Sequence, residues 1–188
     1  MDFGAMLNRL IRAARLDVSL YEEVEADTTL TQEALIVVAL IAAINGIVGF
    51  IASLAMGNGI GAALIGLVWG VVWAIVGYFL YAFLAYFIGT KLFQATTDFG
   101  EMRRVLGYAY GPTIFSLVPC VGWLVALVWT VITGVVAIRQ AMDTDTTKAI
   151  ITAVIAVVIV FIIGAVVGGL IGVGGVGFGA ITDAFQQI

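Results

Sequence analysis

Three long stretches of this sequence contain no charged residue, and they constrain its fold more than any other feature. They cover residues 34–90, 105–138 and 149–182. A helix needs roughly 20 apolar residues to cross the ~30 Å hydrocarbon core of a bilayer, so the first stretch can hold two crossings and each of the others at least one. Only 11% of the 188 residues are charged, whereas a soluble domain carries about 25%. The sequence therefore predicts an integral membrane protein.

Turn and capping signals divide the chain into a polar N-terminal segment, residues 1–33, and five predicted transmembrane helices. The glycine-rich run 57–61 ends the first crossing, because glycine disfavours a continuing helix. Asp98 and Glu101 have the spacing of a capping box, which predicts a helix that begins near Phe99. The expected fold is an all-α integral membrane protein with crossings at residues 34–56, 62–90, 99–118, 121–141 and 147–173, and with a glycine-rich external tail at residues 174–188.

The third crossing is the least regular of the five. Residues 105–118 cover only about 21 Å as an α-helix, and Gly111 and Pro112 interrupt them. We expect this crossing to be short, kinked or re-entrant. A re-entrant hairpin over residues 105–138 would produce the same charge pattern as two crossings. Two crossings are the preferred interpretation, because the fourth segment is long enough to span a bilayer by itself.

All eight Lys and Arg residues fall on one side of this arrangement. Three precede the first crossing, three lie between the second and the third, and two lie between the fourth and the fifth. The positive-inside rule assigns that side to the cytoplasm. We therefore expect a cell-membrane protein with a cytoplasmic N-terminus and an external C-terminus, or an ER or Golgi protein if the chain is eukaryotic.

Apolar residues recur at helical spacing between Phe3 and Ala14, with Arg9, Arg12 and Arg15 on other faces. This pattern predicts a short amphipathic helix. One interpretation places the helix in the headgroup region with its arginines toward lipid phosphates, and the other packs it on the protein's own surface.

An acidic patch follows this helix and lies on the same predicted side as the arginines of the later loops. Its carboxylates are interpreted as a solvated face, as partners that fold back onto those arginines, or as ligands of a divalent cation. Together these residues form a candidate cytoplasmic polar cap, which comprises Glu22, Glu23, Glu25, Asp27, Arg103, Arg104, Arg139 and Asp143.

Small residues recur every four positions in two predicted crossings. In lipid this spacing lets helix backbones approach closely, either within one chain or between copies in a homo-oligomer. A neutral polar residue also lies midway along the first crossing, where it is interpreted as interhelical hydrogen-bonding glue or as the lining of a solute path. These candidate helix-packing residues are Gly66, Gly70, Gly164, Gly168, Gly172 and Asn45.

Several functions are disfavoured by what the sequence lacks. The chain contains no histidine, which removes the commonest general base and metal ligand. The uncharged stretches leave no charge at membrane depth in the predicted crossings, which argues against an ion pump or a proton relay. A calculated pI of about 4.5 argues against a nucleic-acid partner. We expect a protein that is not an enzyme and that holds no cofactor or metal.

Four segments occur in an order that resembles a known family. YEEVEAD (21–27) precedes the first crossing, and RVLGYAYGP (104–112) opens the third. VPCVGWLVALVW (118–129) and AIRQAMD (137–143) follow. The chain resembles a short prokaryotic member of the Yip1-domain family, with family-like motif residues at Gly107, Tyr108, Pro112, Pro119 and Gly122.

The resemblance implies five helices with a cytoplasmic N-terminus. Eukaryotic relatives are associated with Rab-type GTPases, vesicle budding and membrane shaping. The chain lacks their long cytoplasmic N-terminal region and its Asp-Leu-Tyr-Gly-Pro motif, so Rab binding is not carried over. We expect a scaffold or adaptor that contacts membrane lipids, other copies of itself and a cytoplasmic protein partner. The alternative is a small transporter or channel for a neutral solute or lipid.

Overall fold

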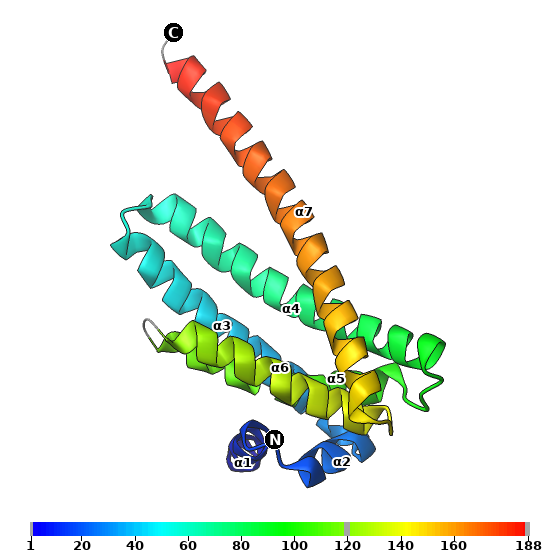
Figure 1. Ribbon diagram of the computed structural model, residues 1–188. Coiled ribbons are helices and arrows are strands. Elements are labelled where there is room, and N and C mark those ends of the chain that lie inside the picture. The colour runs from blue at the N-terminus through cyan, green and yellow to red at the C-terminus, as the bar shows by residue number, and fades with distance from the viewer. Residues whose placement is uncertain (1, 119–120, 187–188) are drawn as a thin grey trace.

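The regular structure of the described residues is entirely helical (Figure 1). The computed structural model describes residues 2–118 and 121–186, and within them the side chains at all positions except 123 and 171–186. Two α-helices and a short 3-10 helix form the N-terminal segment, namely α1 (Phe3–Ala14), α2 (Val18–Ala26) and η1 (Thr28–Leu30). The rest of the chain forms α3 (Thr31–Ala55), α4 (Gly59–Leu92), α5 (Phe99–Ala109), the 3-10 helix η2 (Gly111–Leu117), α6 (Gly122–Ala141) and α7 (Thr146–Gln186).

Four helical stretches among these residues are long and apolar enough to cross a membrane. They are Thr28–Ala55, Gly59–Leu92, Leu124–Ala141 and Thr146–Leu170. The predicted third crossing is not one of them, because it consists of the 11-residue α5 and the 7-residue η2. The break lies at Gly111 and Pro112, as the sequence indicated, since proline is accepted in the first turn of a new helix and not inside an old one.

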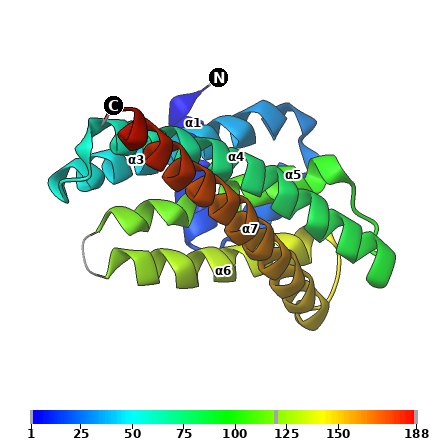
Figure 2. The same cartoon turned by 90° about the horizontal axis from the view of Figure 1, so that it is seen from above.

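Two helical hairpins lie side by side, and α7 crosses them (Figures 1 and 2). The first hairpin is α3 with α4, and the second is α5 and η2 with α6. Helix α7 packs against α4 and α6, and its C-terminal half projects beyond the hairpins (Figure 1). Helices α1 and α2 contact the second hairpin from below in this view.

The turn between α3 and α4 follows from the glycines that the sequence contains there. Gly57 has a φ of +80°, a conformation that glycine adopts without a steric penalty. The N–H of Gly57 donates to the carbonyl of Leu54, and that of Asn58 donates to the carbonyl of Ser53. These two bonds form a Schellman motif, which satisfies the last carbonyls of α3.

Helix α7 differs from the prediction at its C-terminal end. The sequence suggested that the helix ends near residue 173 and that a glycine-rich tail follows, but α7 continues to Gln186. Glycine weakens a helix by only about 1 kcal/mol per residue. In lipid a helix also satisfies its own backbone hydrogen bonds, so the glycines alone do not end it.

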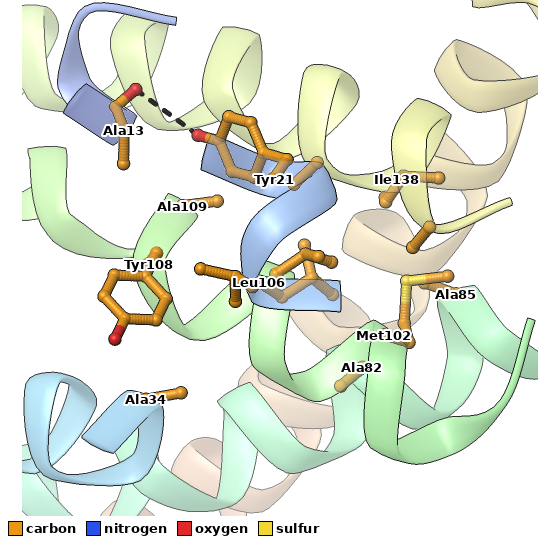
Figure 3. Close-up of a cluster of buried hydrophobic side chains, with 14 of the residues drawn as sticks. Ala13, Tyr21, Ala34, Ala82, Ala85, Met102, Leu106, Tyr108, Ala109 and Ile138 are labelled. Atoms are coloured by element: carbon orange, nitrogen blue, oxygen red, sulfur yellow. Dashed lines mark hydrogen bonds between the residues drawn. The ribbon is translucent and has the colours of Figure 1, made fainter. Parts of the chain in front are cut away.

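The best-packed core lies at the end of the molecule where α1, α2, α5 and the last turns of α6 meet α3 and α4 (Figure 3). Large side chains there are almost fully buried, among them Tyr21, Met102, Tyr108 and Ile138. By contrast, the distal parts of the long helices expose large apolar residues, such as Ile65 at 68% and Phe161 at 75%. Exposed apolar surface of this extent suits contact with lipid chains.

Two glycines lie close to the backbone of a neighbouring element. A Cβ atom at Gly107 on α5 would lie 2.8 Å from the Cβ of Ala34 and 3.0 Å from its carbonyl oxygen on α3. A Cβ atom at Gly122 would lie 2.2 Å from the carbonyl oxygen of Phe115, where α6 starts against η2. Both positions therefore require glycine for packing.

We predict that Gly107→Ala destabilises the protein by about 1–3 kcal/mol, because the added methyl overpacks the contact with the α3 backbone. Thermal unfolding in detergent measures the effect. The matched control is Gly70→Ala, since Gly70 has no neighbouring atom within 4 Å of an added Cβ and alanine favours a helix by up to about 1 kcal/mol. Equal unfolding temperatures for Gly107→Ala and the wild type would show that the contact does not constrain α5.

Candidate functional site

A buried carboxylate joins three helices at the packed end of the molecule. Glu33 in the first turn of α3 is only 7% exposed. Its Oε1 accepts a hydrogen bond from the Tyr108 hydroxyl of α5 at 2.5 Å and one from Nη1 of Arg9 of α1 at 2.9 Å. The N-terminal end of α3 also favours a negative charge at this position. We call Arg9, Glu33 and Tyr108 the Glu33 junction.

Arginines of α1 also pair with the carboxylates of α2 and of the turn before it. Arg9 Nε lies 3.1 Å from Glu23, and Arg12 lies 2.7 Å from the same carboxylate and 2.8 Å from Asp17. The Ser19 hydroxyl and Arg12 lower the pKa of Asp17 to about 2. Each partly exposed pair contributes little alone, but the shared Glu23 carboxylate holds α1 and α2 in one orientation.

Arg104 binds backbone rather than carboxylates. It is 4% exposed, its Nε donates to the Val24 carbonyl at 3.0 Å, and its Nη2 donates to the Glu25 carbonyl. These carbonyls belong to the last turn of α2, where no following helical N–H reaches them. A positive charge at that end is also favoured by the helix dipole.

The pairing of the acidic patch therefore differs from one of its three interpretations, in which its carboxylates fold back onto the later arginines. Glu23 and Glu25 were candidates to pair with Arg103 or Arg104, but Glu23 pairs with Arg9 and Arg12. The reason is that α1 lies beside α2, which places the guanidinium groups of Arg9 and Arg12 within hydrogen-bond distance of Glu23. Arg103 lies with its guanidinium carbon 5.8 Å from the Phe99 ring centroid.

The remaining cap residues have separate roles. Asp27 caps η1 by accepting from the Thr29 backbone N–H at 2.9 Å. Arg139 Nε donates to Gln140, and the Gln140 amide donates to Glu22 at 3.2 Å. Asp143 is exposed and adopts a positive φ directly after α6. Among the described residues, no group of three or more acidic or cysteine side chains is placed to hold a metal ion.

The motif residues serve the α3–α5 contact. Gly107 allows the close approach at Ala34, and Tyr108 reaches Glu33. Pro112 is buried in the first turn of η2, and Gly122 fits against Phe115. Pro119 lies outside the described residues.

The candidate helix-packing residues fall into two groups. Gly164 contacts Trp73 of α4, where an added Cβ would lie 2.6 Å from the ring. No such contact exists at Gly66, Gly70 or Gly168, each of which has open space around it, so close packing within the chain is not made at these three positions. Gly172 lies among the residues whose side-chain surroundings are not described.

Gly66 and Gly70 instead line a cleft of about 350 Å³ between α3 and α4, together with Asn45, Gly49, Ser53 and Tyr110. The Asn45 side-chain oxygen accepts from the Ser116 hydroxyl of η2 at 3.2 Å. Asn45 thus hydrogen-bonds between α3 and the second hairpin while it lines the cleft.

Sequence reasoning missed the Glu33 junction. Glu33 is the last charged residue before the first uncharged stretch. From the sequence it was interpreted only as the end of the polar N-terminal segment. Its place within the first turn of a membrane-entering helix is the signal that could have identified it, because a carboxylate there needs a partner once it is buried.

We predict that protein stability falls as pH rises from about 4.5 to about 7 and then levels off. Burial, followed by the charges of Asp143 and Glu101, raises the pKa of Glu25 from 4.5 to about 7. The folded state therefore binds this proton more tightly than the unfolded state, so acidification through that window stabilises the fold. The chain contains no histidine, the side chain whose ordinary pKa lies in this pH range. The titration of Glu25 is therefore not masked by that of a histidine.

Thermal unfolding between pH 5 and pH 8 tests this titration. Glu25→Gln should lose the dependence, whereas Glu22→Gln, at an exposed neighbouring carboxylate, should keep most of it. A wild-type protein whose stability is constant over this range would contradict the prediction.

Comparison with protein-family models gives a match to the Yip1 domain over residues 18–168. Searches among curated proteins and among solved structures gave no match. The matched region begins with α2, contains the motif at Gly107 and Tyr108, and extends into α7. It covers well over half of the chain and confirms the resemblance found in the sequence. The chain is a multi-pass membrane protein that belongs to the Yip1 domain family.

Proposed function

We propose that this protein is a non-enzymatic membrane scaffold or adaptor that docks a cytoplasmic protein partner through its polar cap. The observation that carries the proposal is the assembly of α1, α2 and the start of α5 into one hydrogen-bonded body around the Glu33 junction and Arg104. Much of the surface of the long helices is apolar and suited to lipid. Charged recognition is therefore concentrated on this body.

We further propose five crossings, with the N-terminus in the cytoplasm and the C-terminus outside. The grouping of Lys and Arg supports this orientation. Residues 104–117 cover roughly 25 Å when the longer rise of a 3-10 helix is included, and a bilayer can thin locally around such a segment. Helix α6 is long enough to complete the second hairpin as a crossing.

One contact favours the re-entrant alternative for the second hairpin. The indole N–H of Trp129, in the N-terminal half of α6, donates to the Ala14 carbonyl at 2.6 Å. Helix α1 therefore lies beside α6 rather than beyond its cytoplasmic end. If α6 crosses fully, Arg12 and Asp17 approach the depth of the hydrocarbon core, where charges are costly.

Labelling of Cys120, the single cysteine of the chain, distinguishes the two arrangements. With five crossings, we predict that a membrane-impermeant thiol reagent added outside intact cells labels Cys120. The control is a protein with Cys120→Ser and Gln94→Cys, whose cysteine should react only after the membrane is permeabilised. Protection of Cys120 from outside reagent, with reaction after detergent unfolding, would establish the re-entrant hairpin.

The docking proposal predicts that partners co-purified from native membranes in a gentle detergent depend on the cap. We expect Glu22→Lys combined with Asp143→Asn to reduce partner recovery at least fivefold, because both side chains are exposed and like charges would oppose a complementary surface. The control is Asn58→Lys in the α3–α4 turn, which should keep the partners. Equal recovery by all three proteins would remove the docking proposal.

A transporter or channel for a neutral solute or lipid is the second candidate function. The cleft between α3 and α4 favours it, because the cleft combines an apolar small-residue lining with the polar Asn45 and Ser53. Uptake by reconstituted vesicles that falls on Gly70→Leu, while partner recovery is unchanged, would support transport over docking.

A further inference from the structure

The proposed crossings place Arg103 at the level where α4 leaves the bilayer. The Tyr78 hydroxyl of α4 donates to the Arg103 carbonyl at 2.5 Å, which places the two residues at the same level. Tyr78 follows Gly59, the first residue of α4, by about 29 Å along the helix. This length matches the ~30 Å hydrocarbon core. If the α3–α4 turn lies at one membrane surface, Arg103 lies at the other.

Arg103 also differs from the arginines that build the packed end of the molecule. Arg9 and Arg12 donate to carboxylates, and Arg104 donates to carbonyls. For Arg103, no described residue accepts a hydrogen bond from the guanidinium, and its Nε is buried without a partner. A guanidinium without an acceptor at this depth is costly, so an oxyanion supplied from outside the protein would stabilise it.

One aromatic ring lies against this guanidinium, and further rings of α4 pack on that ring. Phe99 lies beneath it and packs against Phe83 and Tyr86 with ring centroids 6.3 Å apart in each pair. Phe83 stacks on Phe87 at 6.1 Å, and both rings are about half exposed. Rings at this level suit the region between phosphate groups and acyl chains.

We propose that Arg103, with Phe99 and Phe83, forms a binding site for the phosphodiester of an anionic membrane lipid. The planar guanidinium fork matches two phosphate oxygens, and Phe83, about 7.5 Å beyond Tyr78 along α4, lies at the level of the headgroup and the glycerol. An anionic headgroup is preferred over a zwitterionic one, because no described carboxylate forms an ion pair with Arg103 and its positive charge is left for the lipid. The site goes beyond the docking function and does not depend on it.

Native mass spectrometry of the full chain, purified with a mixture of phosphatidylglycerol and phosphatidylcholine, tests the site. The wild type should retain phosphatidylglycerol, and Arg103→Gln should retain at least fivefold less. Arg103→Lys should also lose most of it, because lysine keeps the charge but not the fork. The matched control is Lys91→Gln, an exposed cation near the end of α4, about 12 Å further along the helix than Phe83; this variant should bind as the wild type does.

Two further outcomes distinguish a specific lipid site from diffuse attraction and from free phosphate. Equal loss in Lys91→Gln and Arg103→Gln would show diffuse attraction and overturn the site. Displacement of the lipid by millimolar inorganic phosphate would assign the guanidinium to free phosphate instead. Arg103→Gln leaves no partner unpaired, so it should unfold at the wild-type temperature without phosphatidylglycerol. If it does not fold, Phe99→Leu keeps the charge but removes the ring, and wild-type lipid retention by that variant would equally overturn the proposal.

Discussion

The packed end of the molecule depends on the need to satisfy one buried carboxylate. Glu33 lies in the first turn of α3 and is nearly removed from solvent. An unpaired charge there would cost several kcal/mol. The Tyr108 hydroxyl and the Arg9 guanidinium remove that cost, and they can do so only when α1 and α5 lie together against α3. One satisfied group thus fixes the relative positions of three helices.

Three of the family-like motif residues, Gly107, Tyr108 and Pro112, acquire a physical meaning from this junction. Gly107 lets the α5 backbone approach Ala34, and the same approach brings the neighbouring Tyr108 within reach of Glu33. Pro112 then begins a 3-10 helix, whose greater rise per residue lengthens a segment that is short as an α-helix. The three residues together decide how the second hairpin enters the molecule.

The arginines around this junction fall into two groups, according to whether the protein itself supplies an acceptor for the guanidinium. Arg9, Arg12 and Arg104 have all their main acceptors within the protein, where they join α1 and α2 to the helical hairpins. Arg103 has a ring beneath it and no described acceptor. This contrast supports the proposal that unsatisfied groups, rather than the total charge of the cap, mark a site where another molecule binds.

Much of the helical framework follows from the sequence alone. The uncharged stretches predict long apolar helices, the Asp98–Glu101 capping box is present as predicted, and the glycine run does end α3. These features are local, because a helix in lipid satisfies its own backbone within a few residues. The sequence did not predict that α7 continues through its glycines, that Gly168 makes no contact, or that Glu23 pairs with Arg9 and Arg12. Those outcomes, like the Glu33 junction, required the tertiary structure, because the partner of a charged or small residue is decided by which helix lies beside it.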